Sequence, residues 1–210
     1  PGTGIAGVVL DYFSEKVGGS AGEEASPDRF WYDSVDFSYH TRAFLKIQDG
    51  CDNSCAYCRV TIARGPGVSL SPEAVLSGFN RLQSEGYREV VLTGVNLTSY
   101  NSKGVNFSTL LSMLTDKAEK GVPGVAGGGL RIRLSSLEPE TIDLQTAAAV
   151  GSGAVCPHFH IPVQSGSSRI LKLMNRNNDR QRITEAVNIL RSAKDDPFIA
   201  ADIIAGFPGE

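Results

Sequence analysis

Three of the four cysteines fall close together, as Cys51, Cys55 and Cys58 in the stretch CDNSCAYCRV. Thiolates are soft ligands for zinc and for iron-sulfur clusters, so three of them in one short loop indicate a metal centre. Three thiolates on a four-iron cube leave one iron without a protein ligand, and an open iron can bind a substrate or cofactor. Cys156 lies far along the chain, and we expect it to be a small buried side chain rather than a ligand.

Other interpretations of the triplet stay open at this point. A structural zinc site needs four ligands, with Cys156 or a histidine as the fourth, and the x3 then x2 spacing differs from the paired C-x2-C of zinc modules. A disulfide framework is not typical of a cytoplasmic chain with an odd cluster of cysteines. Three buried cysteines by chance are the remaining alternative.

The cysteine loop follows a predicted strand, and strands alternate with helices along the rest of the chain. Ser71 and Pro72 are predicted to start the first helix as N-cap and N1, and Gly86 to end it. This alternation predicts a parallel sheet with right-handed crossovers, either doubly wound or curled as in a (β/α) barrel. Reactive groups then gather at the carboxyl ends of the strands. The predicted strands are 43–48, 89–94, 130–136, 158–164 and 198–207, and the later helices are 108–120, 139–150, 168–175 and 179–193.

Composition and charge exclude some classes of protein. The 210 residues carry a net charge of -3, which is not the polycationic footprint of a nucleic-acid binder, so we expect only modest RNA affinity for this piece alone. No long apolar run or signal peptide is present, so we expect a cytoplasmic protein. The chain begins with Pro1, which suggests a piece of a longer protein. Residues 1–42, rich in Gly, Ser and acid, are predicted to be a linker or N-terminal arm, 43–210 the core domain, and 121–129 a Gly-rich connection.

The cysteine motif and the later strand ends resemble the radical S-adenosylmethionine superfamily, whose signature is C-x3-C-x-aromatic-C after the first strand of a partial (β/α)6 barrel. The resemblance implies a [4Fe-4S] cluster on Cys51, Cys55 and Cys58, with S-adenosylmethionine on its open iron. It also implies an α/β fold of this partial-barrel type, truncated here after about five strands. The residues that it implies for the cofactor are Tyr57 over the cluster or a purine, Thr93 and Gly94 for the methionyl amino group, Glu138 for the same amino acid moiety, Arg176 for its carboxylate, and Gln164 and Asp202 for the ribose.

A finer resemblance is to the methylthiotransferases, over roughly residues 40–210, through motifs such as RLSSLEP, HFHIPVQSGS and DIIAGFPGE. It implies addition of a methylthio group to N6-threonylcarbamoyladenosine of tRNA, with isopentenyladenosine or a ribosomal aspartate as alternatives. tRNA and an external electron donor would be the partners of a monomeric enzyme with no membrane attachment. The family's N-terminal domain, with a second four-iron cluster, and its TRAM domain are not in this sequence, so the piece alone should not methylthiolate. RVTIARG also departs from the family's usual Ile-Ile-Pro-Tyr before Ala-Arg-Gly.

Each supporting residue also has an ordinary structural explanation. Glu138 could close a strand, Arg176 could complement a helix dipole, and Gln164 could serve a turn. Asp202 lies within an apolar strand, where a charge is costly unless it is paired. We expect His158 and His160 to lie on opposite faces of their strand and to make a poor metal pair. The alternative function from another class is a non-catalytic iron-sulfur or zinc binding domain.

Overall fold

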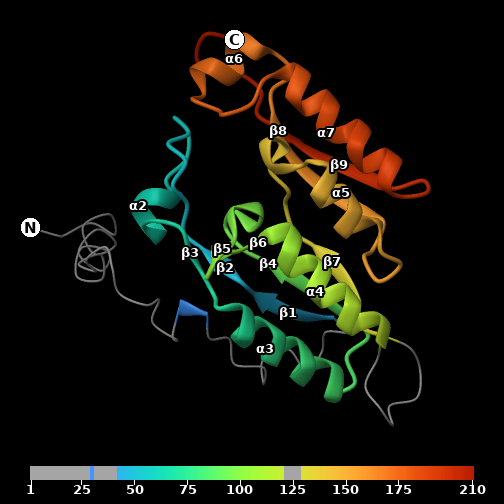
Figure 1. The fold of residues 1–210 in the computed structure, drawn as a ribbon. Helices are drawn as coiled ribbons and strands as arrows, with labels where there is room; N and C mark the ends of the chain where they lie inside the picture. Colours follow the sequence, from blue (N-terminus) through green and yellow to red (C-terminus); the bar gives the residue numbers. More distant parts are fainter. Residues whose placement is uncertain (1–28, 31–41, 121–128) are drawn as a thin grey trace, which may run out of the picture.

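A computed structural model describes residues 29–30, 42–120 and 129–210 (Figure 1). Most of the predicted arm and most of the Gly-rich connection fall outside these residues. The main strands are β1 (Ala43–Lys46), β4 (Glu89–Thr93), β7 (Arg131–Leu134), β8 (His158–Gln164) and β9 (Phe198–Ile203); the helices are α2 (Val60–Arg64), α3 (Pro72–Ser84), α4 (Phe107–Lys120), α5 (Leu144–Gly151), α6 (Ser168–Leu173) and α7 (Arg180–Ala193), with 3-10 turns η3 (Leu97–Ser99) and η4 (Pro139–Thr141).

The five main strands are parallel and follow one another in chain order. β4 pairs with β1 on one side and with β7 on the other, and β8 pairs with β9. The two groups meet through isolated bridges from Ile132 to Val155 and from Ser136 to His160. A doubly wound sheet would reverse its strand order, so the curled, barrel-type arrangement is confirmed. Within the described residues the sheet does not close on itself.

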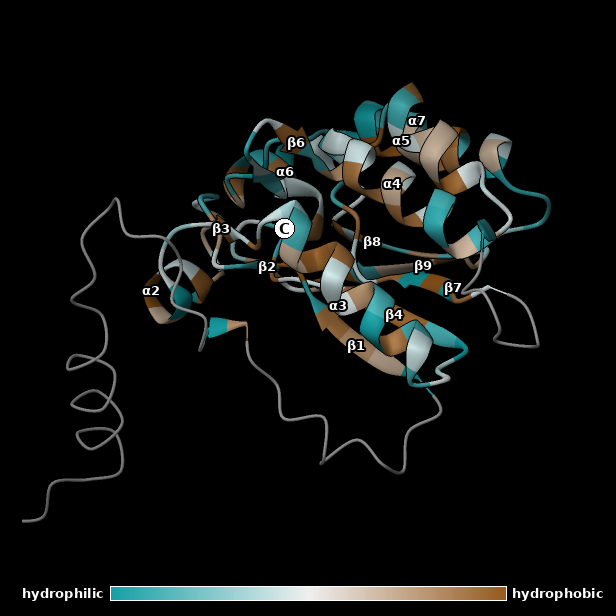
Figure 2. Ribbon diagram, turned by 60° about the horizontal axis from the view of Figure 1, so that its bottom comes forward, coloured by the Kyte–Doolittle hydropathy of each residue, from teal (hydrophilic) through white to brown (hydrophobic). Residues whose placement is uncertain are grey.

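The helices that connect the strands lie side by side along one face of the sheet (Figures 1 and 2). The predicted start of α3 is confirmed, because the Ser71 side chain accepts a hydrogen bond from the backbone N–H of Ala74 and Pro72 is the first helical residue. The helix predicted over 139–150 is instead divided into η4 and α5. Asp143 causes this division, since its carboxylate caps the N–H of Thr146 and starts a new helix there.

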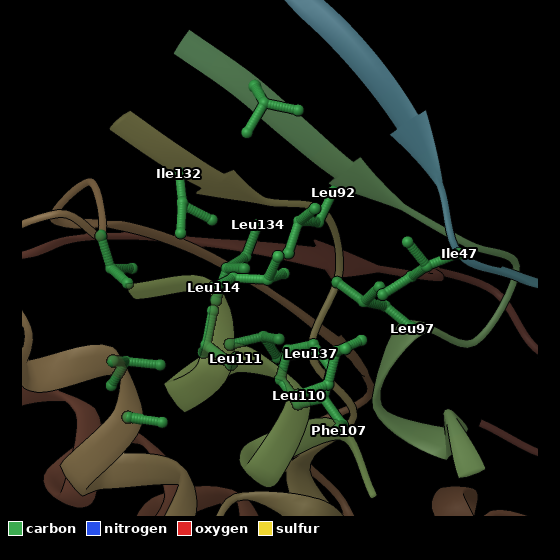
Figure 3. Close-up of a cluster of buried hydrophobic side chains, with 14 of the residues drawn as sticks. Ile47, Leu92, Leu97, Phe107, Leu110, Leu111, Leu114, Ile132, Leu134 and Leu137 are labelled. Atoms are coloured by element: carbon green, nitrogen blue, oxygen red, sulfur yellow. The ribbon is translucent and has the colours of Figure 1, made fainter. Parts of the chain in front are cut away.

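The hydrophobic core lies between the sheet and these helices (Figure 3). Leu92 of β4 and Ile132 of β7 are fully buried against Leu111 and Leu114 of α4. Burial of each such side chain contributes roughly 1.5–3 kcal/mol relative to exposure. Alternate residues of the same strands face the other way, and they are Glu89, Val91 and Thr93 on β4 and Arg131 and Arg133 on β7.

Short elements around the cysteine loop differ from the sequence-based prediction. The strand predicted over 43–48 is broken at Ile47, beyond which β2 (Gln48–Asp49) pairs with β3 (Val68–Ser69) as an antiparallel ladder. A second small ladder joins β5 (Asn101–Ser102) to β6 (Val105–Asn106). Two-residue strands carry no readable alternation, which is why the sequence did not reveal them. None of the helices in the described ranges combines the length and apolar character needed to cross a membrane.

Candidate functional site

The cysteine loop leaves the sheet after β2 and returns through α2 and β3. Gly50 opens the loop at φ 72°, where a Cβ would lie 2.0 Å from the carbonyl oxygen of Pro66. The N–H of Cys51 donates to the carbonyl of Gly65 at 3.2 Å, which closes the base of the loop. Only glycine permits both the left-handed backbone and the close approach of the two ends.

A buried carboxylate holds the base of this loop. Asp49 is fully buried and lies 2.9 Å from the Lys46 ammonium and 3.0 Å from the Arg29 guanidinium. Burial raises the pKa of Asp49, but the hydrogen bonds from Lys46 and Arg29 outweigh it, so the net pKa is lowered. Arg29 also donates to the carbonyl of Arg64. The described fragment of the arm therefore ties the two ends of the cysteine loop together.

All three loop cysteines are free thiols that are partly exposed, and each receives hydrogen bonds or faces a cation. The backbone N–H groups of Asn53 and Val60 lie 3.4 Å from the sulfurs of Cys51 and Cys58. Asn96 Nδ2 lies 3.8 Å from the Cys51 sulfur, and Arg176 Nη1 lies at the same distance from that of Cys55. Hydrogen-bond donors directed at ligand sulfurs are among the contacts by which a protein tunes an iron-sulfur cluster.

The same sulfurs do not form a site for a single ion. Among the residues that the structure describes, no three Cys, His, Asp or Glu side chains converge on a point where one metal ion could be held. A zinc site requires such convergence, whereas the cysteines of a four-iron cube bind different irons and stand farther apart. The described residues thus hold no preformed site for a single ion.

Cys156 is remote from this loop. It is buried, and its thiol donates to Glu89 Oε2 at 3.8 Å. Glu89 is the first residue of β4, so the pair lies at the amino ends of the strands, opposite the cysteine loop. Burial raises the pKa of the Cys156 thiol, which keeps it protonated and unsuited to bind metal.

Thr93 and Gly94 lie where β4 ends, next to the start of the cysteine loop. A Cβ on Gly94 would meet the Cβ and side-chain oxygen of Gln48 at 2.9 and 3.0 Å. The Gln48 side chain accepts from the N–H of Asn96 at 2.7 Å and donates to the carbonyl of Gly50 at 2.8 Å. It thus joins the turn after β4 to the loop that carries the cysteines. Sequence reasoning missed Gln48 and Asn96, although an amide side chain at the end of the first predicted strand, three residues before Cys51, was a signal for such a link.

Glu138 and Arg176 form an ion pair beside the cysteine loop. Arg176 Nη2 donates to Glu138 Oε2, and the two side chains are 3% and 14% exposed. Burial raises the pKa of Glu138, and the Arg176 guanidinium offsets this only in part. Arg176 also donates to the carbonyl of Pro162 at 3.2 Å, yet its buried Nε has no partner within the described residues. Arg176 therefore keeps one buried donor without a partner among the described residues, on the side chain that also contacts the Cys55 sulfur.

Tyr57 lies near Cys55 and the ion pair of Arg176 and Glu138. Burial raises the pKa of its hydroxyl to about 12, against the lowering effect of the Arg176 charge. The ring therefore stays neutral between Cys55 and the ion pair. The structure thus brings the three cysteines, Tyr57, Glu138 and Arg176 together, with Thr93 and Gly94 at the adjoining strand end.

Gln164 and Asp202 lie on β8 and β9, farther along the same edge. Gln164 has a φ of 65°, a conformation that is rare for residues with a side chain. Asp202 is exposed and lies 3.1 Å from His160 Nε2, while His160 Nδ1 lies 2.7 Å from the hydroxyl of Ser136. The Asp202 side chain is 66% exposed, so water solvates its charge and the cost expected for an unpaired charge in an apolar strand does not arise. The expectation that His158 and His160 face opposite sides was wrong, because residues two apart on a strand point the same way.

The described residues fit a cluster and a small zwitterionic cofactor. Three partly exposed thiols with donors near their sulfurs suit a cube with one open iron. The carboxylate and guanidinium of the ion pair offer one group for an amine and one for a carboxylate. The residues of this site lie at the carboxyl ends of parallel strands, where such folds bind their ligands.

Comparison with known proteins agrees with this fit. The sequence profile of the radical SAM superfamily matches residues 45–210. The chain is 41% identical over 191 residues to the threonylcarbamoyladenosine tRNA methylthiotransferase of Treponema pallidum, covering 91% of this chain and 38% of that protein. It is 37% identical over 206 residues to the protein of the same name from Thermotoga maritima, covering 96% and 46%. The tRNA-2-methylthio-N(6)-dimethylallyladenosine synthase of Pelotomaculum thermopropionicum is 39% identical over 170 residues, with 80% and 37% covered.

Solved structures give the same fold. The radical S-adenosylmethionine methyltransferase TsrM from Kitasatospora setae, solved with cobalamin and a [4Fe-4S] cluster, superposes with a TM-score of 0.67 at 14% identity, covering 83% of this chain and 33% of that chain. The chain spans less than half the length of the curated relatives described above.

Proposed function

The chain belongs to the radical S-adenosylmethionine superfamily, and from that premise we propose that residues 43–210 bind a [4Fe-4S] cluster and S-adenosylmethionine to modify a nucleoside of tRNA. The observation that carries the proposal is the set of donors near the three loop sulfurs, next to the buried pair of Glu138 and Arg176. A non-catalytic metal-binding domain would not require that pair, since burying two charges is costly without a ligand to use them.

Each residue has a defined part in this proposal. Cys51, Cys55 and Cys58 would hold the cluster, and when bound, the cluster and S-adenosylmethionine together supply a radical that abstracts hydrogen from an unactivated carbon. Arg176 would bind the methionyl carboxylate, and Glu138 would accept the amino group together with the turn at Thr93 and Gly94. Tyr57, which stays neutral, would cover the cluster and exclude water. Gln164 and Asp202 would bind the ribose hydroxyls.

We propose N6-threonylcarbamoyladenosine as the substrate nucleoside, in the full-length protein. Two of the relatives described above carry this nucleoside in their names, and the other is named for dimethylallyladenosine, which stays the alternative. A second cluster, an external electron donor and the remaining tRNA contacts would come from outside residues 43–210. The full protein would act as a monomer in the cytoplasm, where tRNA is modified.

Anaerobic reconstitution with iron and sulfide tests the cofactor. We expect a brown chromophore in the unaltered chain and in the Cys156→Ser variant, and its loss in Cys51→Ser, Cys55→Ser and Cys58→Ser. Addition of S-adenosylmethionine should change the electron paramagnetic resonance spectrum of the reduced cluster, since the open iron gains ligands. A cluster that is lost in Cys156→Ser, or one whose spectrum does not change when S-adenosylmethionine is added, would favour the non-catalytic alternative.

Mass spectrometry of tRNA nucleosides tests the substrate. A strain that lacks the full-length gene should lose the methylthio form of N6-threonylcarbamoyladenosine and keep that of isopentenyladenosine. The reverse result would assign the protein to the other nucleoside.

A further inference from the structure

The segment from Met174 to Asn177, between α6 and α7, contacts the cysteine loop at four consecutive residues. The two segments are more than a hundred residues apart in sequence. The contacts are Ala56 N to the Met174 carbonyl at 2.9 Å, Asn175 Nδ2 to the Ser54 carbonyl at 2.9 Å and to its hydroxyl at 2.7 Å, Arg176 Nη1 to the Cys55 sulfur at 3.8 Å, and Asn177 Nδ2 to Asn53 Oδ1 at 3.1 Å.

Asn175 is well suited to this contact. Its φ is 55°, in the left-handed region that asparagine tolerates better than most residues. The turn directs its amide at Ser54, while the preceding Met174 is fully buried and anchors the segment in the core. The donor is thus held by the fold rather than by the cysteine loop.

The contact joins distant parts of the sheet. The cysteine loop follows the strand at one end of the order, whereas Met174 to Asn177 follow β8, near the other end. Among the described residues, the two groups of strands are joined by isolated bridges at Ile132 and Ser136. Figure 1 shows the loop before α2 and the region of α6 on the same side of the molecule. These hydrogen bonds therefore join the cysteine loop, at one end of the strand order, to the segment after β8, near the other end.

We propose that Asn175 and Asn177 are positioning residues that clamp the cysteine loop to the segment carrying Arg176. The proposal rests on the function proposed above for the three cysteines and Arg176. Because Arg176 lies between the two asparagines, the clamp sets the place of Cys55 and of the carboxylate-binding guanidinium as one unit. Loosening of the clamp separates them, so cluster retention and cofactor affinity fall together.

Hydrogen exchange of the metal-free, reduced chain tests the clamp without any cofactor. In Asn175→Gly, which keeps the left-handed backbone but removes the amide, we expect the Ala56 N–H to exchange about tenfold faster, as for the loss of two hydrogen bonds. Lys103→Gly is the matched control, since Lys103 also has a positive φ, of 51°, and its side chain pairs with the exposed Glu73, far from the cysteine loop in sequence. The Ala56 N–H should be unchanged there. An unchanged rate in Asn175→Gly overturns the proposal.

Measurements on the reconstituted chain test the consequence. Asn175→Gly and Asn177→Ala should lose iron to a chelator several-fold faster than the unaltered chain and bind S-adenosylmethionine about five- to tenfold more weakly, while Lys103→Gly should match the unaltered chain. Normal iron retention and affinity in both asparagine variants overturn the positioning role. If the unaltered chain forms no cysteine-dependent cluster, the proposed function fails, and hydrogen exchange still decides whether the clamp exists.

Discussion

The Arg176 guanidinium lies against the Glu138 carboxylate, with both side chains largely buried at the carboxyl ends of the strands. The sequence resemblance assigned each of them to a different group of one cofactor, and the tertiary structure joins them into one pair. A ligand with an amine and a carboxylate meets two groups that are already aligned, at little cost in ordering side chains.

Arg176→Lys should lower the free energy of unfolding of the chain and its affinity for S-adenosylmethionine. Lysine keeps the charge but cannot bond Glu138, the Pro162 carbonyl and the Cys55 sulfur at once. We expect a loss of about 2 kcal/mol in the free energy of unfolding of the metal-free chain. Urea titration measures it, and Arg180→Lys, at an exposed position, serves as the control. Equal stability of the two variants would show that the pair contributes nothing.

Asn96→Ala should lower the reduction potential of the cluster. A hydrogen bond to a ligand sulfur stabilises the more negative, reduced state, so its loss makes reduction harder. For a bond of about 1 kcal/mol and a one-electron couple, the expected fall is about 40 mV. Redox titration followed by electron paramagnetic resonance measures it. Asn101→Ala, the same change at an exposed site, should leave the reduction potential of the cluster unchanged.

Gly94→Ala should destabilise the turn after β4. The added Cβ would lie within 3.0 Å of the Gln48 side chain and 3.1 Å from its carbonyl oxygen. Since Gln48 is buried and held by other hydrogen bonds, we expect a loss of about 1–3 kcal/mol, as for overpacking. Gly153→Ala is the control, because its Cβ would meet no atom of the described residues within 4 Å, and it should change the free energy of unfolding by less than about 0.5 kcal/mol.

The ion pairs of Glu89 should make the free energy of unfolding of the chain decrease as the pH falls below about 4.5. Burial raises the pKa of Glu89, but the hydrogen bonds of Arg133 and Arg131 and the charge of Arg42 outweigh it and lower the pKa to about 2. In the unfolded chain the pKa is near its ordinary 4.5. The contribution is therefore complete above pH 4.5 and is lost as the pH falls toward 2, up to about 3 kcal/mol.

Urea titrations of the metal-free chain at pH 7, 4 and 3 measure this loss. Glu89→Gln cannot ionise, so its stability should change less between pH 7 and pH 3 than that of the unaltered chain. If the free energies of unfolding of the two proteins fell by the same amount between pH 7 and pH 3, the assignment of the acid sensitivity to Glu89 would be contradicted.

The sequence by itself determined the main elements of this protein. β8 has the predicted bounds, Ser71 caps α3 as predicted, and the cysteine loop follows the first strand. These features depend on local chemistry, since periodicity, capping and turn residues act over a few positions. The position of Asp143 explains why one predicted helix became two, and that signal was also local.

Only the tertiary structure decided which side chains meet. The pairing of Glu138 with Arg176, the link from Gln48 to Asn96, and the bonds from Asn175 and Asn177 to the cysteine loop join residues far apart in the chain. Such contacts follow from the order and curl of the strands, which bring loops after different strands to one edge. No spacing in the sequence encodes them, because their geometry is fixed by the packing of the core beneath.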